Sequence, residues 1–300
     1  MRDDGAAETA GDGLDGPFDG AFDDKADGVG PRGTTRAFAI EHGAFPGGGH
    51  PDVVAYLPER FDATPPLDVI VFLHGWNNCA SNVIGSVDRA CTPGGARRRS
   101  YALAAQLEAT GKNAILIAPE LAFDRATGDP GRLGEPGALV ALLDDTLAQL
   151  APELGAERSA NDVGRVIVAS HSGGYRTAAA FVRDQSLPID ELYLLDSLYG
   201  ETDAFDAWID DDRDAFASGA RRFASIYTRD GGTLAESQAM AARAAAWLPP
   251  AAIHDDRSTA TWTAPAYAHG ALFKRTGLTH DGVPRYYVGR LILTSALASH

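Results

Sequence analysis

Short apolar runs alternate with longer amphipathic segments over most of this sequence. Runs that are apolar at nearly every position are typical of strands buried on both faces of a sheet, whereas apolar residues at every third or fourth position predict helices. The predicted strands are Thr34–Ile40, Val53–Leu57, Leu67–Leu73, Ala114–Ala118, Arg165–Ala169, Glu191–Leu195, Arg222–Tyr227 and Ala271–Arg275. The predicted helices are Ser100–Thr110, Gly137–Leu150, Gly174–Asp184, Asp203–Ser218, Thr233–Leu248 and Pro284–Leu297. Repeated strand–helix units indicate one α/β domain over residues 34–300, with a mostly parallel sheet and helices on both of its faces.

The helix over 233–248 has a recognisable start. Thr233 is followed three positions later by Glu236, which is the pattern of a capping box at a helix N-terminus. We therefore expect the Thr233 side chain to cap this helix.

The segment before the first strand differs in composition. Residues 1–33 are rich in Gly, Asp and Ala and poor in branched apolar side chains. Such a segment cannot bury enough surface to offset the entropy lost on ordering, so we predict a disordered acidic arm. Met1 is followed by acidic residues rather than by an apolar run, so we expect that an export leader, if the protein has one, is absent from this sequence.

The charge of the chain narrows the expected partners. The 300 residues carry a formal net charge of −15. An acidic protein repels nucleic acid phosphates and anionic membrane surfaces, so neither is an expected partner. No stretch has the roughly 20 consecutive apolar residues that a membrane-spanning helix needs. No glycine pattern of a nucleotide site is present either, and no cofactor is expected.

The two cysteines, Cys79 and Cys91, lie in one predicted loop. A disulfide closing this loop would require an oxidising compartment, and the alternative is two unrelated reduced thiols. We favour the disulfide and hence a secreted or periplasmic protein, with the cytoplasm as the alternative. No spacing of cysteine and histidine suggests a metal site.

The most informative segment is VIVASHSGGY at positions 166–175. A buried strand ends in small residues, followed by Ser172, two glycines and a helix-forming run. This arrangement matches the nucleophile elbow G-x-S-x-G, with Ser170 in place of the first glycine. The elbow holds its serine on a strained turn at a helix N-terminus, where the helix dipole favours developing negative charge. Ser172 is the predicted nucleophile, and a plain strand–helix turn capped by Ser172 is the alternative.

A second motif lies upstream, where the strand 67–73 ends in His74-Gly75-Trp76. With this motif and the elbow, the chain resembles the α/β-hydrolases, and the resemblance covers roughly residues 34–297. The resemblance implies the α/β-hydrolase fold, with backbone N–H groups of Trp76 and Gly173 forming the oxyanion hole. It also implies a structural rather than catalytic role for His74.

The resemblance further implies a histidine near the C-terminus as the base. His280 lies directly before the last predicted helix, as the family arrangement requires, and His269 is the alternative. His254 lies in a polar segment beside two aspartates, and His300 is the terminal residue, so neither is favoured.

The acid that orients this base has two candidates. Asp196 closes the strand 191–195, where a buried carboxylate needs a partner such as a histidine N–H. Asp230 follows the strand 222–227 but also fits a turn. We favour Asp196.

These residues predict a serine hydrolase that cleaves carboxylic esters through an acyl-enzyme. The short segment after Leu198 leaves little room for a large lid, so we expect no large lid domain. The same triad could cleave amides or transfer acyl groups, and a non-catalytic binding module is a further alternative. Trp76, Tyr175 and Tyr199 are candidates to line the pocket for a small or polymeric ester.

Overall fold

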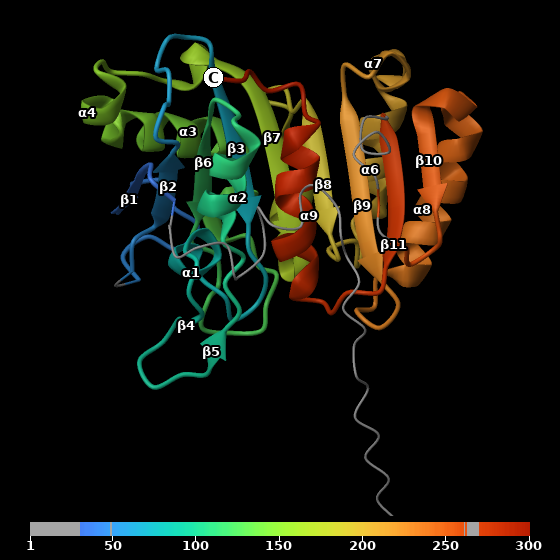
Figure 1. Ribbon diagram of the computed structural model, residues 1–300, viewed down its shortest axis with the longest axis horizontal. Coiled ribbons are helices and arrows are strands. Elements are labelled where there is room, and N and C mark those ends of the chain that lie inside the picture. The colour runs from blue at the N-terminus through green and yellow to red at the C-terminus, as the bar shows by residue number, and fades with distance from the viewer. Residues whose placement is uncertain (1–30, 49, 261, 263–269) are drawn as a thin grey trace, which may run out of the picture.

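The computed structural model describes residues 31–48, 50–260, 262 and 270–300. Nine strands of this part form one sheet in the order β1-β2-β6-β3-β7-β8-β9-β11-β10 (Figure 1). Their bounds are β1 Thr34–Phe38, β2 Val53–Leu57, β3 Leu67–Leu73, β6 Ala114–Pro119, β7 Val163–His171, β8 Glu191–Leu195, β9 Arg222–Thr228, β10 Ile253–Asp256 and β11 Ala271–Thr276. Only the pairs β1–β2 and β2–β6 are antiparallel, so the sheet is mostly parallel as predicted.

Helices cover both faces of this sheet, because successive side chains of its central strands point to opposite sides. Val69, Val71 and Leu73 of β3 belong to one apolar cluster, while Ile70 and Phe72 belong to the other. The helices are α1 Ala80–Ile84, α2 Leu103–Thr110, α3 Ala138–Gln149, α4 Ala151–Leu154, α5 Tyr175–Asp184, α6 Thr202–Asp210, α7 Arg213–Ser218, α8 Leu234–Trp247 and α9 Gly282–Leu293. Residues of α1, α2 and α9 line the second cluster, and those of α3 to α8 line the first.

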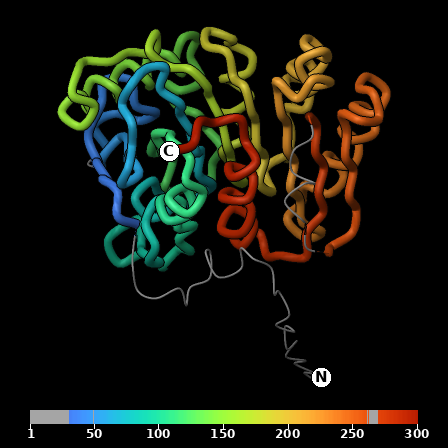
Figure 2. Tube along the Cα trace, turned by 45° about the horizontal axis from the view of Figure 1, so that its top comes forward, coloured from blue at the N-terminus to red at the C-terminus, as the bar shows by residue number. Residues whose placement is uncertain are grey.

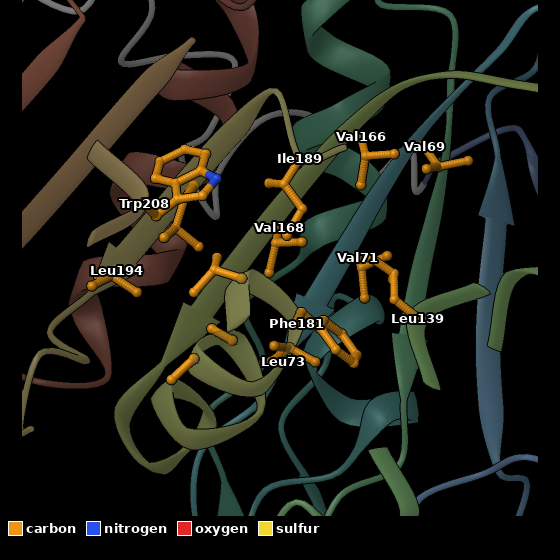
Figure 3. Close-up of a cluster of buried hydrophobic side chains, with 14 of the residues drawn as sticks. Val69, Val71, Leu73, Leu139, Val166, Val168, Phe181, Ile189, Leu194 and Trp208 are labelled. Carbon is orange, nitrogen blue, oxygen red and sulfur yellow. The ribbon is translucent and has the colours of Figure 1, made fainter. Parts of the chain in front are cut away.

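Figure 3 shows part of the first cluster, in which β3 and β7 present valines and Leu73 toward Leu139 of α3 and Phe181 of α5. All of these side chains are at most 2% exposed. On the opposite face, α2 and α9 lie side by side although they are far apart in sequence (Figures 1 and 2). Gln106 of α2 joins them, since its amide accepts a bond from Gly289 N (2.6 Å) and donates one to Pro284 O (3.2 Å).

Some predicted elements need correction. The acidic segment 203–218 forms two helices, α6 and α7, and strand β10 was missed because its sequence Ile-His-Asp-Asp is polar. The helix predicted from Ser100 begins at Leu103, and Ser100 makes no cap. The capping box at Thr233 is also wrong: no side-chain cap bond forms, because the Thr233 hydroxyl donates to Asp196 instead. Of the arm predicted over residues 1–33, residues 1–30 lie outside the part of the chain that the structure describes.

None of the helices in the described ranges is long and apolar enough to cross a membrane.

Cys79 and Cys91 form the expected disulfide. It joins the residue before α1 to the hairpin of β4 (Arg89–Ala90) and β5 (Arg97–Arg98), which projects below the sheet in Figure 1. The bond therefore ties an otherwise peripheral loop to the body of the protein.

Replacing both cysteines by serine is expected to lower the free energy of unfolding by about 3 kcal/mol, the cost of freeing a loop of this length in the unfolded chain. Urea denaturation of the variant and of wild type, with and without reductant, measures this. Reductant should destabilise wild type by a similar amount and leave the variant unaffected. Equal stability of all four samples would contradict the prediction.

Candidate active site

Ser172 lies in a tight turn between β7 and α5. Its φ angle is +52°, in the left-handed region that residues other than glycine rarely adopt. The two glycines that follow permit the close approach of neighbouring segments: a Cβ on Gly174 would lie 2.5 Å from Leu73 O, and one on Gly173 would lie 2.1 Å from Trp76 Nε1. The backbone of Leu73 therefore excludes a side chain at position 174, whereas a side chain at position 173 would require Trp76 to move.

The loop after β3 lies directly against this turn, because β3 and β7 are neighbours in the sheet. A Cβ on Gly75 would lie 2.6 Å from Ser172 Cβ, so only glycine fits there. Trp76 and Gly173, the two residues predicted to form the oxyanion hole, are thus brought together. The buried His74 has hydrogen-bond partners other than Ser172. Its Nε2 is 2.9 Å from Glu120 Oε1, and its Nδ1 is 2.9 Å from Gly75 O.

Asp196 follows β8, the next strand of the sheet, and its side chain is fully buried. Its Oδ1 accepts hydrogen bonds from Thr228 N (3.0 Å) and from the Thr233 hydroxyl. Its Oδ2 accepts from Thr228 Oγ1 (2.8 Å) and from His280 Nδ1 (2.7 Å). Burial alone would raise the pKa of Asp196, but the bonds from His280, Thr233 and Thr228 together outweigh burial and lower it below its usual value. The carboxylate is therefore held in its charged form.

His280 lies in the loop between β11 and α9. Because its Nδ1 bonds to Asp196, its Nε2 is left to accept or give up a proton. The alternative acid, Asp230, has a side chain that is 91% exposed and lies 3.6 Å from its neighbour Arg229. Among the other histidines, His254 lies on β10 with its ring 5.5 Å from that of Trp262, and His269 falls outside the described residues. The structure thus brings His280 to Asp196.

Two residues near this pair were missed by the sequence analysis. His171, the last residue of β7, is buried, and its ring centroid lies 4.4 Å from that of His280. Its Nδ1 is 2.8 Å from the Tyr101 hydroxyl and its Nε2 is 3.2 Å from His280 O. Since a carbonyl can only accept, His171 donates from Nε2 and accepts from Tyr101. No pattern in the sequence pointed to this link, which joins β7, the segment before α2 and the His280 loop.

Burial, assisted by the nearby imidazole of His280, lowers the pKa of His171 to about 3. In the unfolded chain this group titrates near 6.5, so below about pH 6.5 the unfolded state binds the extra proton and stability falls as the pH falls. Replacing His171 by phenylalanine removes this dependence. From pH 7 to pH 5, the free energy of unfolding of wild type is expected to fall by about 2 kcal/mol relative to that of the variant, as measured by urea unfolding.

The matched control is Tyr101→Phe, which removes the bond to His171 Nδ1 and keeps the imidazole. It should retain the acid dependence of wild type. A difference between His171→Phe and wild type that stays constant with pH would contradict a neutral buried His171.

Tyr199 lies beside the reacting end of this arrangement. Its ring centroid is 6.4 Å from that of His280 and 6.0 Å from that of Tyr175, and its side chain is partly exposed. Burial raises the pKa of Tyr199, while a hydrogen-bond interaction with the Ser172 side chain acts in the opposite direction. A neutral phenol is thus available next to the Ser172 hydroxyl.

His171, His280 and Asp281 offer donor atoms within 4.8 Å of one another, the arrangement from which a metal site could be built. However, both nitrogens of His171 have hydrogen-bond partners, and Nδ1 of His280 is bonded to Asp196. A metal would have to displace several of these bonds, so the geometry favours hydrogen bonding over metal ligation.

No protein-family model and no curated protein matches this sequence. Among solved structures, the chain is similar to a mutant of the feruloyl esterase module from Clostridium thermocellum complexed with sinapinate, with 13% identity over 99% of both chains and a TM-score of 0.56. It is also similar to a ferulic acid esterase, with 10% identity, 88% of this chain and 98% of that chain covered, and a TM-score of 0.51. With the strand order and the helix layers described above, these similarities show that the chain has the α/β-hydrolase fold.

Proposed function

We propose that this protein is a serine hydrolase that cleaves carboxylic esters, with Ser172 as nucleophile, His280 as base and Asp196 as the acid that orients it. The observation that carries the proposal is the 2.7 Å bond between His280 Nδ1 and the buried Asp196. It lies at the carboxyl ends of the central strands, where Ser172 occupies its left-handed turn. Serine needs an imidazole oriented in this way to become an effective nucleophile.

The reaction then proceeds in two steps. In the first, His280 Nε2 takes the proton of the Ser172 hydroxyl while Oγ attacks the ester carbonyl, and the same proton passes to the leaving alkoxide, so that an acyl-enzyme and an alcohol form. In the second, His280 takes a proton from water, the resulting hydroxide attacks the acyl group, and Ser172 recovers its proton as the acid leaves. Asp196 stays ionised throughout and stabilises the imidazolium.

In both steps negative charge develops on the carbonyl oxygen. We propose that the backbone N–H groups of Trp76 and Gly173 donate to this oxygen. The close packing of Trp76 on Gly173 supports this role, because it keeps the two segments together. One such donor typically contributes about 3 kcal/mol to lowering the barrier.

Esters are favoured over amides because the two similar structures are described as a feruloyl esterase and a ferulic acid esterase. The test compares turnover of 4-nitrophenyl acetate with that of a peptide 4-nitroanilide, together with labelling by a fluorophosphonate probe. We expect ester turnover, much slower anilide turnover and labelling at Ser172. Faster anilide turnover would make the protein an amidase, and neither turnover nor labelling would make it a binding module.

We also propose that the protein works outside the cytoplasm, in a secreted or periplasmic form. The disulfide between Cys79 and Cys91 supports this location, because disulfides persist in oxidising compartments.

A further inference from the structure

A pocket of about 440 Å³ lies next to the pair of Asp196 and His280. The segment after β9, the end of β11 with the loop that follows it, and Thr259 line this pocket. His280 itself forms part of the wall. Gly231 forms another part, and it lies so close to Asp196 that a Cβ there would come within 2.1 Å of Oδ2. The pocket therefore adjoins the proposed base and lies at the edge of the sheet where ligands bind in α/β proteins.

Two arginines line this pocket, and the less exposed of them is Arg275, near the end of β11. Its side chain is half-buried, and its Nε is buried without a hydrogen-bond partner. Within the ranges that the structure describes, no carboxylate forms an ion pair with it. A desolvated guanidinium N–H without an acceptor is costly, and the described part of the chain supplies none for this one.

The other charged groups around the pocket do not neutralise Arg275. Arg229 and Asp230 both line the wall, both are exposed, and they lie 3.6 Å from each other. Asp255 of β10 acts on the same neighbour, Tyr227, as Arg275 does, but Asp255 is paired with Arg257 at 2.9 Å. Asp196 is saturated by its four hydrogen bonds. The residues that line the pocket thus include two arginines and one aspartate, while the ionised Asp196 lies behind Gly231.

We infer that this pocket is a subsite for a carboxylate group on the substrate, and that the enzyme prefers esters carrying a free acid. This inference rests on the proposed function. Arginine binds carboxylates through two parallel N–H donors, and the hydroxyls of Thr259 and Thr279 in the wall offer further donors. A carboxylate seated there would hold the ester beside His280.

The experiment compares matched esters with the full-length protein. One pair is 4-acetoxybenzoate and its neutral isostere 4-acetoxybenzamide, which place the acid on the alcohol side. The other is the mono-4-nitrophenyl ester of adipic acid and 4-nitrophenyl hexanoate, which place it on the acyl side. In at least one pair, wild type is expected to show a kcat/KM roughly tenfold to 100-fold higher for the acid, the size expected of a hydrogen bond to a charged group.

Arg275→Gln should reduce this ratio to near one, and Arg275→Lys should retain part of it. Arg36→Gln, which removes an arginine of β1 at the opposite end of the sheet, should leave the ratio as in wild type. Raising the ionic strength to ~1 M, where the Debye length is about 3 Å, should also weaken the preference. Thermal melting confirms that each variant is folded, and if Arg275→Gln fails to fold, Arg275→Lys and the salt series decide.

An equal kcat/KM for the acid and neutral members of both pairs, or the same ratio in wild type and Arg275→Gln, would overturn the subsite. Neutral esters separate this failure from that of the proposed function. If wild type hydrolyses them and Ser172→Ala does not, the serine hydrolase stands even when the carboxylate preference is absent.

Discussion

Replacing Ser172 by alanine is expected to lower kcat/KM for 4-nitrophenyl acetate by roughly 10⁴-fold to 10⁶-fold, the range found when the nucleophile of a serine triad is removed. The physical reason is that the acyl-enzyme can no longer form, so that only the oxyanion donors and substrate binding remain. Labelling by a fluorophosphonate probe should disappear in the same variant.

The fold should survive this change, because Ser172 is only partly buried and the turn depends on the neighbouring glycines for its close packing. Alanine and serine are similarly strained in the left-handed region. The melting temperature should therefore change little. Ser186→Ala, at an exposed serine away from the site, is the matched control and should keep full activity and labelling. Labelling that persists in Ser172→Ala would assign the nucleophile elsewhere.

The second large effect is expected for Asp196→Asn, with a loss of roughly 10³-fold to 10⁴-fold in kcat/KM for the same neutral ester. An amide oxygen carries no charge to stabilise the imidazolium, and an amide NH₂ turned toward His280 would favour the wrong tautomer. The variant should also be less stable, because an NH₂ in the position of Oδ2 cannot accept the bond that Thr228 Oγ1 now donates. Melting temperature and activity are measured on the same samples.

The low pKa of Asp196 determines the pH at which Asp196→Asn should be compared with wild type. Its folded pKa lies below the value near 3.9 of an unfolded aspartate, so its contribution to stability is fully present above about pH 4 and is lost as the pH falls through the folded value. At neutral pH the variant therefore reports the loss of a fully charged group. Asp230→Asn provides the comparison: it should retain at least ~100-fold more activity than Asp196→Asn, and the reverse order would assign the acid to Asp230.

The apolar runs of the sequence were sufficient to identify the central strands. Leu67–Leu73 and Glu191–Leu195 were predicted with their observed bounds, because strands buried on both faces must be apolar at nearly every position. Helix starts were less predictable. Thr233 has the pattern of a cap, yet its hydroxyl is directed to a carboxylate that is 37 residues away in sequence. Local patterns cannot reveal such a competition, since it depends on which strands become neighbours.

For the candidate site too, the sequence alone predicted some features, and only the tertiary structure revealed others. Small residues around Ser172, a histidine before the last helix and an aspartate at a strand end are local features, so the sequence alone could nominate Ser172, His280 and Asp196. It favoured Asp196 but left Asp230 open, because each follows a strand. The choice depends on sheet order: β8 lies directly beside β7, and the His280 loop reaches Asp196 across 84 residues of sequence. Only the tertiary structure decided that bond, the burial of His171 and the lack of a carboxylate partner for Arg275 among the described residues. The physical reason is that distant segments of the chain contribute the charge, the burial and the hydrogen bonds at one point in space.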